Sequence, residues 1–299
     1  MTQPDHVWQQ IADLMEDATG EVVVIAPFIK KAIFAETIAS VPSSVQKITC
    51  VTRWTPAEVA AGVSDPEIIE AAQSDPRISI ALCPSLHAKL YRADGRCLVG
   101  SANLTGKATG RVPNANVELL LEVPSDHPEV QRVLGQIDAR STAATPLMAF
   151  LVRQQAELLK NERRISPPAE AEAAPYWYPE TRRPETVYAL YSGRQRFTSR
   201  VEAGIVRDLA MLDVPVGLSE EAFNAEVETR LHGIPELDQL ISEHRLSNVQ
   251  LQLAIAERTG DTADQARRTT ETLAAWLQHF GRYYTEVGSW ELRPGKEHA

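Results

Sequence analysis

The sequence predicts an α/β fold, in which a mixed, mostly parallel sheet is flanked by helices, followed by a mainly helical C-terminal domain that ends in a β-hairpin. Two observations lead to this prediction. In the first half of the chain, short apolar segments alternate with amphipathic ones, which is the order of strands and helices in such a sheet. In the second half, helix-like segments follow one another, and the last segment, RYYTEVGSWELRPG, reads as two strands around a Val-Gly-Ser turn.

The elements of the predicted sheet domain follow in order from the first residues. Residues 4–19 have apolar side chains at helical spacing and stop at Gly20, and EVVVIAPFI is a buried strand. Residues 30–40 form a helix, KITCVTRW and RISIALC are strands, and the segments between them, TPAEVAAG and DPEIIEAAQ, are short helices with proline at the first position. HAKLYR, CLV and VELLLEV are then expected as strands, and DHPEVQRVLGQIDA and TPLMAFLVRQQAELLKNERR as helices.

Composition places the boundary between domains. The segment ISPPAEAEAAP is rich in Pro, Ala and Glu, as exposed connections are. We therefore expect a catalytic domain at residues 1–165, a linker at 166–184 and a mainly helical domain at 185–299. Three short helices followed by a hairpin is the order of a winged helix, so this last domain is interpreted either as a nucleic-acid-binding domain or as an interaction domain.

The composition is that of a soluble globular protein, with 43% hydrophobic and 23% charged residues in 299. The chain has no run of eighteen apolar residues, and MTQPDHVWQQ lacks the features of a secretory signal, so neither a membrane partner nor export is expected. Its 3 cysteines include no CxxC pair, which argues against disulfides and zinc and for the reducing cytoplasm.

Reactive side chains concentrate in residues 86–122. His87 and Lys89 are two residues apart in a predicted strand, so both side chains project from the same face. Asp94 follows after four more residues. An imidazole beside an ammonium group supplies a nucleophile and a clamp for an anion.

The next predicted strand, CLV, runs into Gly100 and Ser101, with Asn103 two residues on. Small and amide-bearing residues of this kind let the backbone and a carboxamide close on an anion. A further strand, VELLLEV, carries Glu118 just past its start. Together with His87 and Lys89, these groups are what an attack on a phosphate diester requires.

The pattern H-x-K-x4-D followed by GSxN resembles the signature of the phospholipase D superfamily, over about residues 5–140. The segments LHAKLY and LVGSANLT are more similar to the sequences of its bacterial nuclease branch than to those of its lipases. Many members carry two motifs in one chain, whereas here no other histidine has lysine two residues on. The resemblance therefore implies a homodimer in which each copy supplies half of the site. The helix at residues 146–164 and the face beside the GSAN loop are the candidate interfaces.

The chemistry and the resemblance agree on a mechanism. His87 attacks phosphorus to give a phosphohistidine, and the same histidine of the second protomer protonates the leaving oxygen and then activates water. Lys89 and Asn103 hold the non-bridging oxygens, so no metal or other cofactor is expected.

The remaining residues of the motif are expected to support this chemistry. Ser101 donates to the phosphate or holds its loop. Glu118 accepts a hydrogen bond from His87 and sets its tautomer. Asp94 holds the turn after its strand, and Gly100 allows the backbone to approach closely.

The net charge of −10 means that any surface for nucleic acid is a local patch. Arg53 and Trp54 follow a predicted strand and are candidates to contact a phosphate or base, and Lys107 lies just after the GSAN motif. A segment from residue 176 to 200 combines arginines with six aromatic residues, as single-stranded nucleic acid prefers. Its candidate contacts are Arg182, Arg183, Arg194 and Arg196. The alternative is that these aromatics pack in the protein interior and the arginines pair with acids.

The prediction is therefore a metal-independent phosphodiesterase, a nuclease for DNA or RNA, with restriction or phage defence as its setting and a helicase or other defence-system protein as a possible partner. The alternatives are a lipid hydrolase or transphosphatidylase, and a catalytically silent nucleic-acid-binding protein. The lipid alternative predicts an exposed apolar loop or amphipathic helix near the site, which the sequence does not indicate. The intact set of His87, Lys89, Asn103 and Glu118 argues against the silent protein.

Overall fold

The computed structural model describes residues 6–165, 177–281, 283–285 and 291–294. The chain divides into two compact units, which we describe separately. Unit 1 comprises residues 1–157 and 215–217, and unit 2 comprises residues 158–214 and 218–299. Residues 166–176 of the predicted linker lie outside the described residues.

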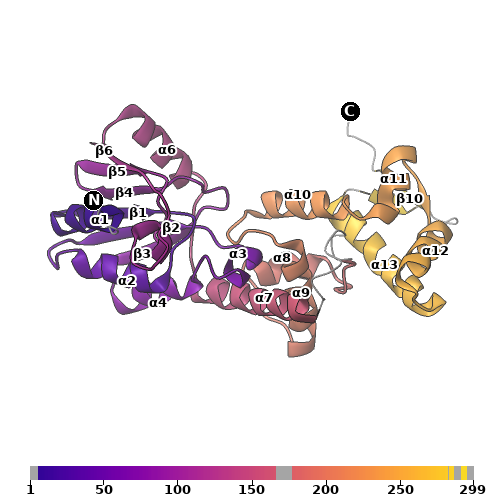
Figure 1. The fold of residues 1–299 in the computed structure, drawn as a ribbon. Coiled ribbons are helices and arrows are strands. Elements are labelled where there is room, and N and C mark those ends of the chain that lie inside the picture. The colour runs from indigo at the N-terminus through magenta and orange to yellow at the C-terminus, as the bar shows by residue number, and fades with distance from the viewer. Residues whose placement is uncertain (1–5, 166–176, 282, 286–290, 295–299) are drawn as a thin grey trace. The chain divides into compact units, whose positions relative to one another are not determined.

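Unit 1 is built on a seven-stranded sheet with the order β6-β5-β4-β1-β2-β3-β7 (Figure 1). The strands are β1 (Glu21–Ile25), β2 (Lys47–Thr52), β3 (Ile78–Leu82), β4 (Leu90–Ala93), β5 (Arg96–Gly100), β6 (Leu120–Pro124) and β7 (Thr142–Ala143). Pairing is parallel between β1, β2 and β3, and antiparallel in the other four pairs. The predicted mixed sheet is confirmed. Four strands, β1, β2, β3 and β5, run in the same direction.

Helices cover both faces of this sheet (Figure 1). They are α1 (His6–Glu16), α2 (Lys31–Ser40), α3 (Pro56–Ala60), α4 (Ile69–Ser74), α5 (Gly106–Thr109), α6 (Pro128–Asp138) and α7 (Pro146–Ile165), with a 3-10 turn η1 (Pro66–Ile68). The larger core lies under α1, α2, α4 and the first half of α7. The smaller core lies on the other face, where α6 packs through Val130 and Ile137.

Two of the predicted strands begin later than expected, and this affects the site. The ladder between β4 and β5 ends at the pair Leu90 and Val99, so His87 and Lys89 lie in the segment before β4. Similarly, β6 begins at Leu120, and Glu118 precedes it. The alternation of side chains still continues through the first segment. Leu86 and Leu90 pack in the core beneath α6, which leaves the intervening odd-numbered positions to face the other way.

Unit 2 is mainly helical and ends in a small sheet, as predicted. Its helices are α8 (Glu185–Tyr191), α9 (Ser199–Leu212), α10 (Glu220–Leu231), α11 (Asp238–Glu243), α12 (Asn248–Thr259) and α13 (Ala263–Phe280), with a 3-10 turn η2 (Pro235–Leu237). The strands β9 (Tyr283–Thr285) and β10 (Glu291–Pro294) pair antiparallel, and β8 (Leu246–Ser247) pairs with β10. The predicted Val-Gly-Ser turn falls in residues 286–290, outside the described residues. Within the described chain, no helix combines the length and apolarity that crossing a bilayer requires.

Asp94 closes the end of the sheet that is remote from His87. It has a left-handed backbone (φ 49°), and its carboxylate accepts hydrogen bonds of 2.8–2.9 Å from the backbone of Thr19, Gly20 and Glu21 and from the Thr19 hydroxyl. The bond from the Thr19 N–H is the main reason why the pKa of Asp94 lies below its usual value. Because β4 runs antiparallel to β1, Asp94 lies at the start of β1 and His87 lies near its end.

We predict that Asp94→Asn lowers the free energy of unfolding by about 1–2 kcal/mol near pH 7, because the hydrogen bonds lose their charged acceptor. A carboxylate with a lowered folded-state pKa stabilises the fold above its unfolded pKa of about 3.9, and loses this effect as the pH falls through the folded value. Urea denaturation near pH 7 and near pH 3 measures both effects. An equal difference between wild type and variant at the two pH values would contradict this account.

Candidate active site

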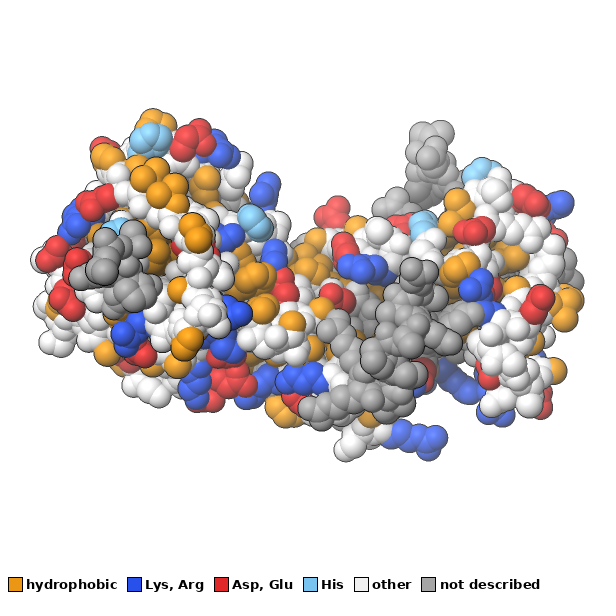
Figure 2. Space-filling view, in the orientation of Figure 1, with side chains coloured by type: hydrophobic (Ala, Val, Ile, Leu, Met, Phe, Trp, Pro, Cys, Tyr) orange, Lys and Arg blue, Asp and Glu red, His pale blue; other side chains and the backbone are white. Residues whose placement is uncertain are grey.

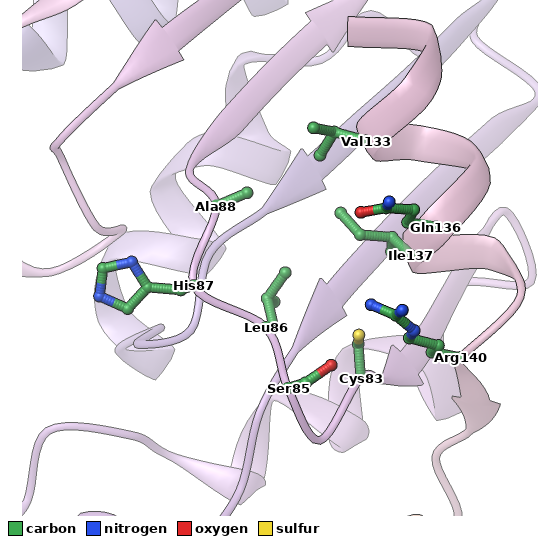
Figure 3. Close-up of a pocket in the computed structure, with 9 residues that line it drawn as sticks. All are labelled: Cys83, Ser85, Leu86, His87, Ala88, Val133, Gln136, Ile137 and Arg140. Atoms are coloured by element: carbon green, nitrogen blue, oxygen red, sulfur yellow. The ribbon is translucent and has the colours of Figure 1, made fainter. Parts of the chain in front are cut away.

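His87 and Lys89 point to the same side of the segment that leads into β4. The ammonium group of Lys89 donates to the backbone carbonyl of His87 at 2.8 Å. Leu86 and Ala88 pack on the opposite side, against the core beneath α6. Figure 3 shows the His87 imidazole directed away from the side chains of α6 that line a pocket there. The His87 ring is exposed, so it can reach a substrate on its own side.

Three hydrogen bonds hold the GSAN loop after β5. Ser101 donates its N–H to Leu119 at 3.0 Å, and the buried Tyr91 hydroxyl donates to the carbonyl of Ala102 at 2.9 Å. Phe28 lies just after β1, and its N–H donates to the side-chain oxygen of Asn103 at 3.3 Å. Because the oxygen of this amide is engaged, its NH₂ group is left as the donor available to a ligand.

Glu118 does not accept from His87, so this predicted hydrogen bond is wrong. Its carboxylate accepts from the Ser101 hydroxyl and from the amide of Asn116 at 3.1 Å, and the Ser101 hydroxyl in turn accepts from Leu119 N–H at 3.1 Å. The reason is topological. Glu118 directly precedes β6, and β6 pairs with β5, so Glu118 lies beside the GSAN loop. β5 therefore lies between Glu118 and the segment that carries His87.

Charged groups of both signs lie around Lys89. Burial is the main cause that lowers the pKa of Lys89; the Glu118 carboxylate raises it and the Arg53 guanidinium lowers it. Arg53 is fixed beside His87, because it donates to the carbonyl of Leu86 at 2.9 Å and forms an ion pair with Glu58. The exposed imidazole thus shares its segment with one cation, Lys89, that has no ion-pair partner among the described residues, whereas the charge of Arg53 is offset by Glu58. An unpaired ammonium group is available to an anionic substrate.

Gly100 permits the closest backbone approach near the site. A Cβ atom at this position would lie 1.8 Å from the carbonyl oxygen of Leu119. This contact joins the end of β5 to the start of β6 and so sets the position of Ser101 relative to Glu118. Asp94, in contrast, lies at the far end of β4, five residues from Lys89 and about 17 Å along an extended chain.

Trp54 is wrong as a candidate for contacting nucleic acid. Its side chain is 1% exposed and belongs to the larger core of unit 1, because the chain turns inward after β2. Arg53 lies beside the candidate site, as described above. Lys107 is exposed on α5, and its backbone carbonyl accepts from Asn116 at 2.9 Å.

The arginine and aromatic segment of unit 2 is divided between core and surface. Tyr188 and Tyr191 are buried and contact the Phe223 ring, so the prediction of a stacking surface is wrong for them. Arg194 pairs with Glu220, and Arg196 pairs with Glu202, as the alternative from sequence stated. Arg182 and Arg183 are exposed.

No broad basic surface is visible on the face presented in Figure 2, where acidic and basic side chains are interspersed. Among the described residues, no group of three or more His, Cys, Asp or Glu side chains is arranged to hold a metal ion. The cysteines, Cys50, Cys83 and Cys97, are free and buried.

Three residues that orient the site were not predicted from the sequence. Tyr91 and Phe28 position the GSAN loop, and Asn116, together with the predicted Ser101, positions Glu118. For Tyr91, the signal in the sequence was alternation, because Tyr91 follows His87 and Lys89 at the same spacing of two residues.

No protein-family model matches the chain, and no curated protein matches it. Among solved structures, it is similar to NucT from Helicobacter pylori, with 15% identity, a TM-score of 0.37, and coverage of 47% of this chain and 92% of that one. It is also similar to Nuc from Salmonella typhimurium, a phospholipase D family member (15%, TM-score 0.35, 48% and 93%). A third is the phosphatidylserine synthase of Haemophilus influenzae Rd KW20 (13%, TM-score 0.39, 56% and 44%).

We predict that Gly100→Ala destabilises unit 1 by about 1–3 kcal/mol or more, because the new methyl group must push β6 away from β5. Gly95→Ala is the matched control, since a Cβ there meets nothing within 4 Å. Urea denaturation of the three proteins measures the difference. A Gly100→Ala protein as stable as Gly95→Ala would contradict the close approach described here.

Proposed function

We propose that the protein is a metal-independent phosphodiesterase that cleaves nucleic acid through a phosphohistidine, at a site completed by a second copy of the chain. The observation that carries this proposal is the exposed His87 imidazole on the same side as Lys89, with the NH₂ group of Asn103 held on the neighbouring loop. The resemblance of this motif to the phospholipase D superfamily supports the same reaction. Restriction or phage defence, in the cytoplasm and with a helicase or another defence protein as partner, is the setting we propose.

In the first step, a neutral His87 nitrogen attacks phosphorus. The bond between phosphorus and the leaving oxygen breaks, and that oxygen takes a proton from the imidazolium of the second protomer. In the second step, the now neutral imidazole of that protomer removes a proton from water, the water oxygen attacks phosphorus, and the phosphorus–nitrogen bond breaks to release His87. Each proton and electron pair is thus returned, and the two rings end as they began.

The other groups stabilise the charge on the phosphorane. Lys89 supplies a positive charge and Asn103 a neutral donor to the non-bridging oxygens. Arg53 is held near Lys89 by the Leu86 carbonyl and by Glu58, which offsets its charge, so Lys89 supplies the main positive charge. Glu118 and Ser101 hold the loop, and the Glu118 carboxylate also offsets part of the charge of Lys89. Both are positioning residues.

The apolar edge of β6 supports a dimer at this site. β6 is an edge strand, and Leu119 and Leu121 are 59% and 55% exposed, with Val117 also fully exposed just before the strand. These three residues, which we call the β6 edge, flank Glu118 and the GSAN loop. An unpaired strand with exposed aliphatic side chains is a template for pairing with another copy, and a twofold interface here would bring two half-sites together.

A second candidate function is favoured by the same surface. A lipid phosphodiesterase would present exposed apolar residues near its site, and the β6 edge meets this condition, although none was evident from the sequence. The two functions differ in the role of the β6 edge, which would contact a second protomer in one case and a membrane surface in the other.

We predict cleavage of single- or double-stranded DNA, or of RNA, in the presence of EDTA, and a loss on the order of 10⁴-fold or more in His87→Ala. His6→Ala, which removes an exposed histidine of α1, is the control and should retain full activity. Labelled nucleic acids and phosphatidylcholine vesicles are tested side by side. Release of choline without cleavage of nucleic acid would favour the lipid function, and dependence on added magnesium would refute the proposal.

We predict a dimer by analytical ultracentrifugation, and a monomer without nuclease activity for Leu121→Lys, because the charged side chain cannot be buried at a paired β6 edge. Leu253→Lys, at a residue of α12 with 65% exposure, is the matched control and should remain dimeric and active. An active wild-type monomer would contradict the shared site. A Leu121→Lys protein that stays dimeric would place the interface elsewhere.

A further inference from the structure

The backbone of residues 178–183 in unit 2 is held by two buried side chains. Asp208 of α9 is buried, and its carboxylate accepts from the N–H groups of Glu180 and Thr181 at 2.9 and 2.8 Å. The buried Trp276 of α13 donates its indole N–H to the carbonyl of Thr181 at 2.7 Å. The residue that follows, Arg182, is therefore presented from a fixed backbone, although the segment has no regular secondary structure.

A pocket of about 340 Å³ lies where this segment meets α9 and α13. Three arginines from three different parts of the chain line it: Arg182, Arg207 of α9 and Arg268 of α13. Glu180 is the one acidic residue among the lining side chains that the structure describes, and Arg207 forms an ion pair with it.

The charge of the pocket is therefore not balanced. Within the part of the chain that the structure describes, the guanidinium groups of Arg182 and Arg268 make neither an ion pair nor a hydrogen bond. Arg267, the neighbour of Arg268 on α13, differs because it forms an ion pair with Asp264. In a chain with a net charge of −10, two unpaired arginines at one pocket, in addition to the paired Arg207, leave an excess of about two positive charges.

We infer that this pocket binds the phosphate of a nucleotide, either within or at the end of a nucleic acid strand or in a free nucleotide. Guanidinium groups bind phosphate oxygens through two parallel N–H bonds, and a phosphate monoester carries about −1.5 to −2 charges near pH 7. The ring of Tyr178 also lines the pocket, which is large enough for a small ligand, so a base can pack against it. The choice of a nucleotide rests on the proposed nuclease function, whereas the anion site rests on the geometry alone.

Fluorescence anisotropy with labelled single-stranded DNA tests this inference, in a His87→Ala background so that the strand is not cut. We expect Arg182→Gln and Arg268→Gln each to weaken binding by about 5- to 20-fold and to reduce the dependence on salt, since each removes one phosphate contact. Arg267→Gln is the matched control, because it removes an adjacent arginine that pairs with Asp264 and does not line the pocket. It should change affinity by less than about 2-fold.

Competition with ADP and with inorganic phosphate separates the two sources of phosphate. If ADP at micromolar concentration displaces the DNA, the ligand of the pocket is a free nucleotide. If ADP does not displace the DNA, the ligand is a nucleic acid strand. Equal affinity of the Arg182→Gln, Arg268→Gln and Arg267→Gln variants, or no binding of DNA or ADP to the parent protein, would overturn the inference. Hydrolysis of bis(p-nitrophenyl) phosphate by the same arginine variants, with His87 intact, is measured separately. The rate of this hydrolysis reports on the proposed catalytic function and should be unchanged in the arginine variants. The proposed catalytic function and the phosphate pocket can therefore fail independently of each other.

Discussion

The site of unit 1 depends on the close approach of β5 and β6 at Gly100. With no side chain there, the end of β5 comes near enough to the carbonyl of Leu119 for Ser101 to pair with the start of β6. The loop that follows is then fastened to β4 through Tyr91 and to the end of β1 through Phe28. The start of β6, the start of β4 and the end of β1 thus meet at the loop that follows β5 and carries Asn103.

The fold could be predicted from local patterns, because each element carries its own signal. The apolar runs of β1, β2 and β3 and the proline residues at the starts of α3 and α6 were sufficient to place those elements. The boundaries were less accurate where pairing with a neighbour decides them. β4 starts at Leu90 because the ladder to β5 ends there, which no local pattern in HAKLYR reveals.

The site could be predicted by residue type and only partly by contact. The shared side of His87 and Lys89 follows from alternation alone, and the structure preserves it outside a strand. The hydrogen-bond partner of Glu118 depends on the order of strands in the sheet. Glu118 therefore accepts from the Ser101 hydroxyl and not, as expected, from His87. Trp54 shows the same limit, because a tryptophan at the end of a strand reads the same in sequence whether it faces solvent or the core.

An acidic chain can still bind a polyanion if a few cations are left unpaired at chosen places. In unit 1 one such cation is Lys89, whereas Arg53 near it is paired with Glu58, and in unit 2 they include Arg182 and Arg268. Many other arginines, such as Arg194 and Arg196, are neutralised by acids on the surface. The net charge is thus a weak guide to the substrate, and the pairing of individual side chains is a better one.

The central claim is that two His87 rings, one from each copy, act in turn as nucleophile and acid. Rapid quenching during turnover of labelled DNA, followed by mass spectrometry of the peptides, tests it most directly. We expect an acid-labile phosphoryl group with its attached nucleotide on His87, in at most one of every two chains. A covalent adduct on another residue, or turnover in which His87 is never modified, would contradict it.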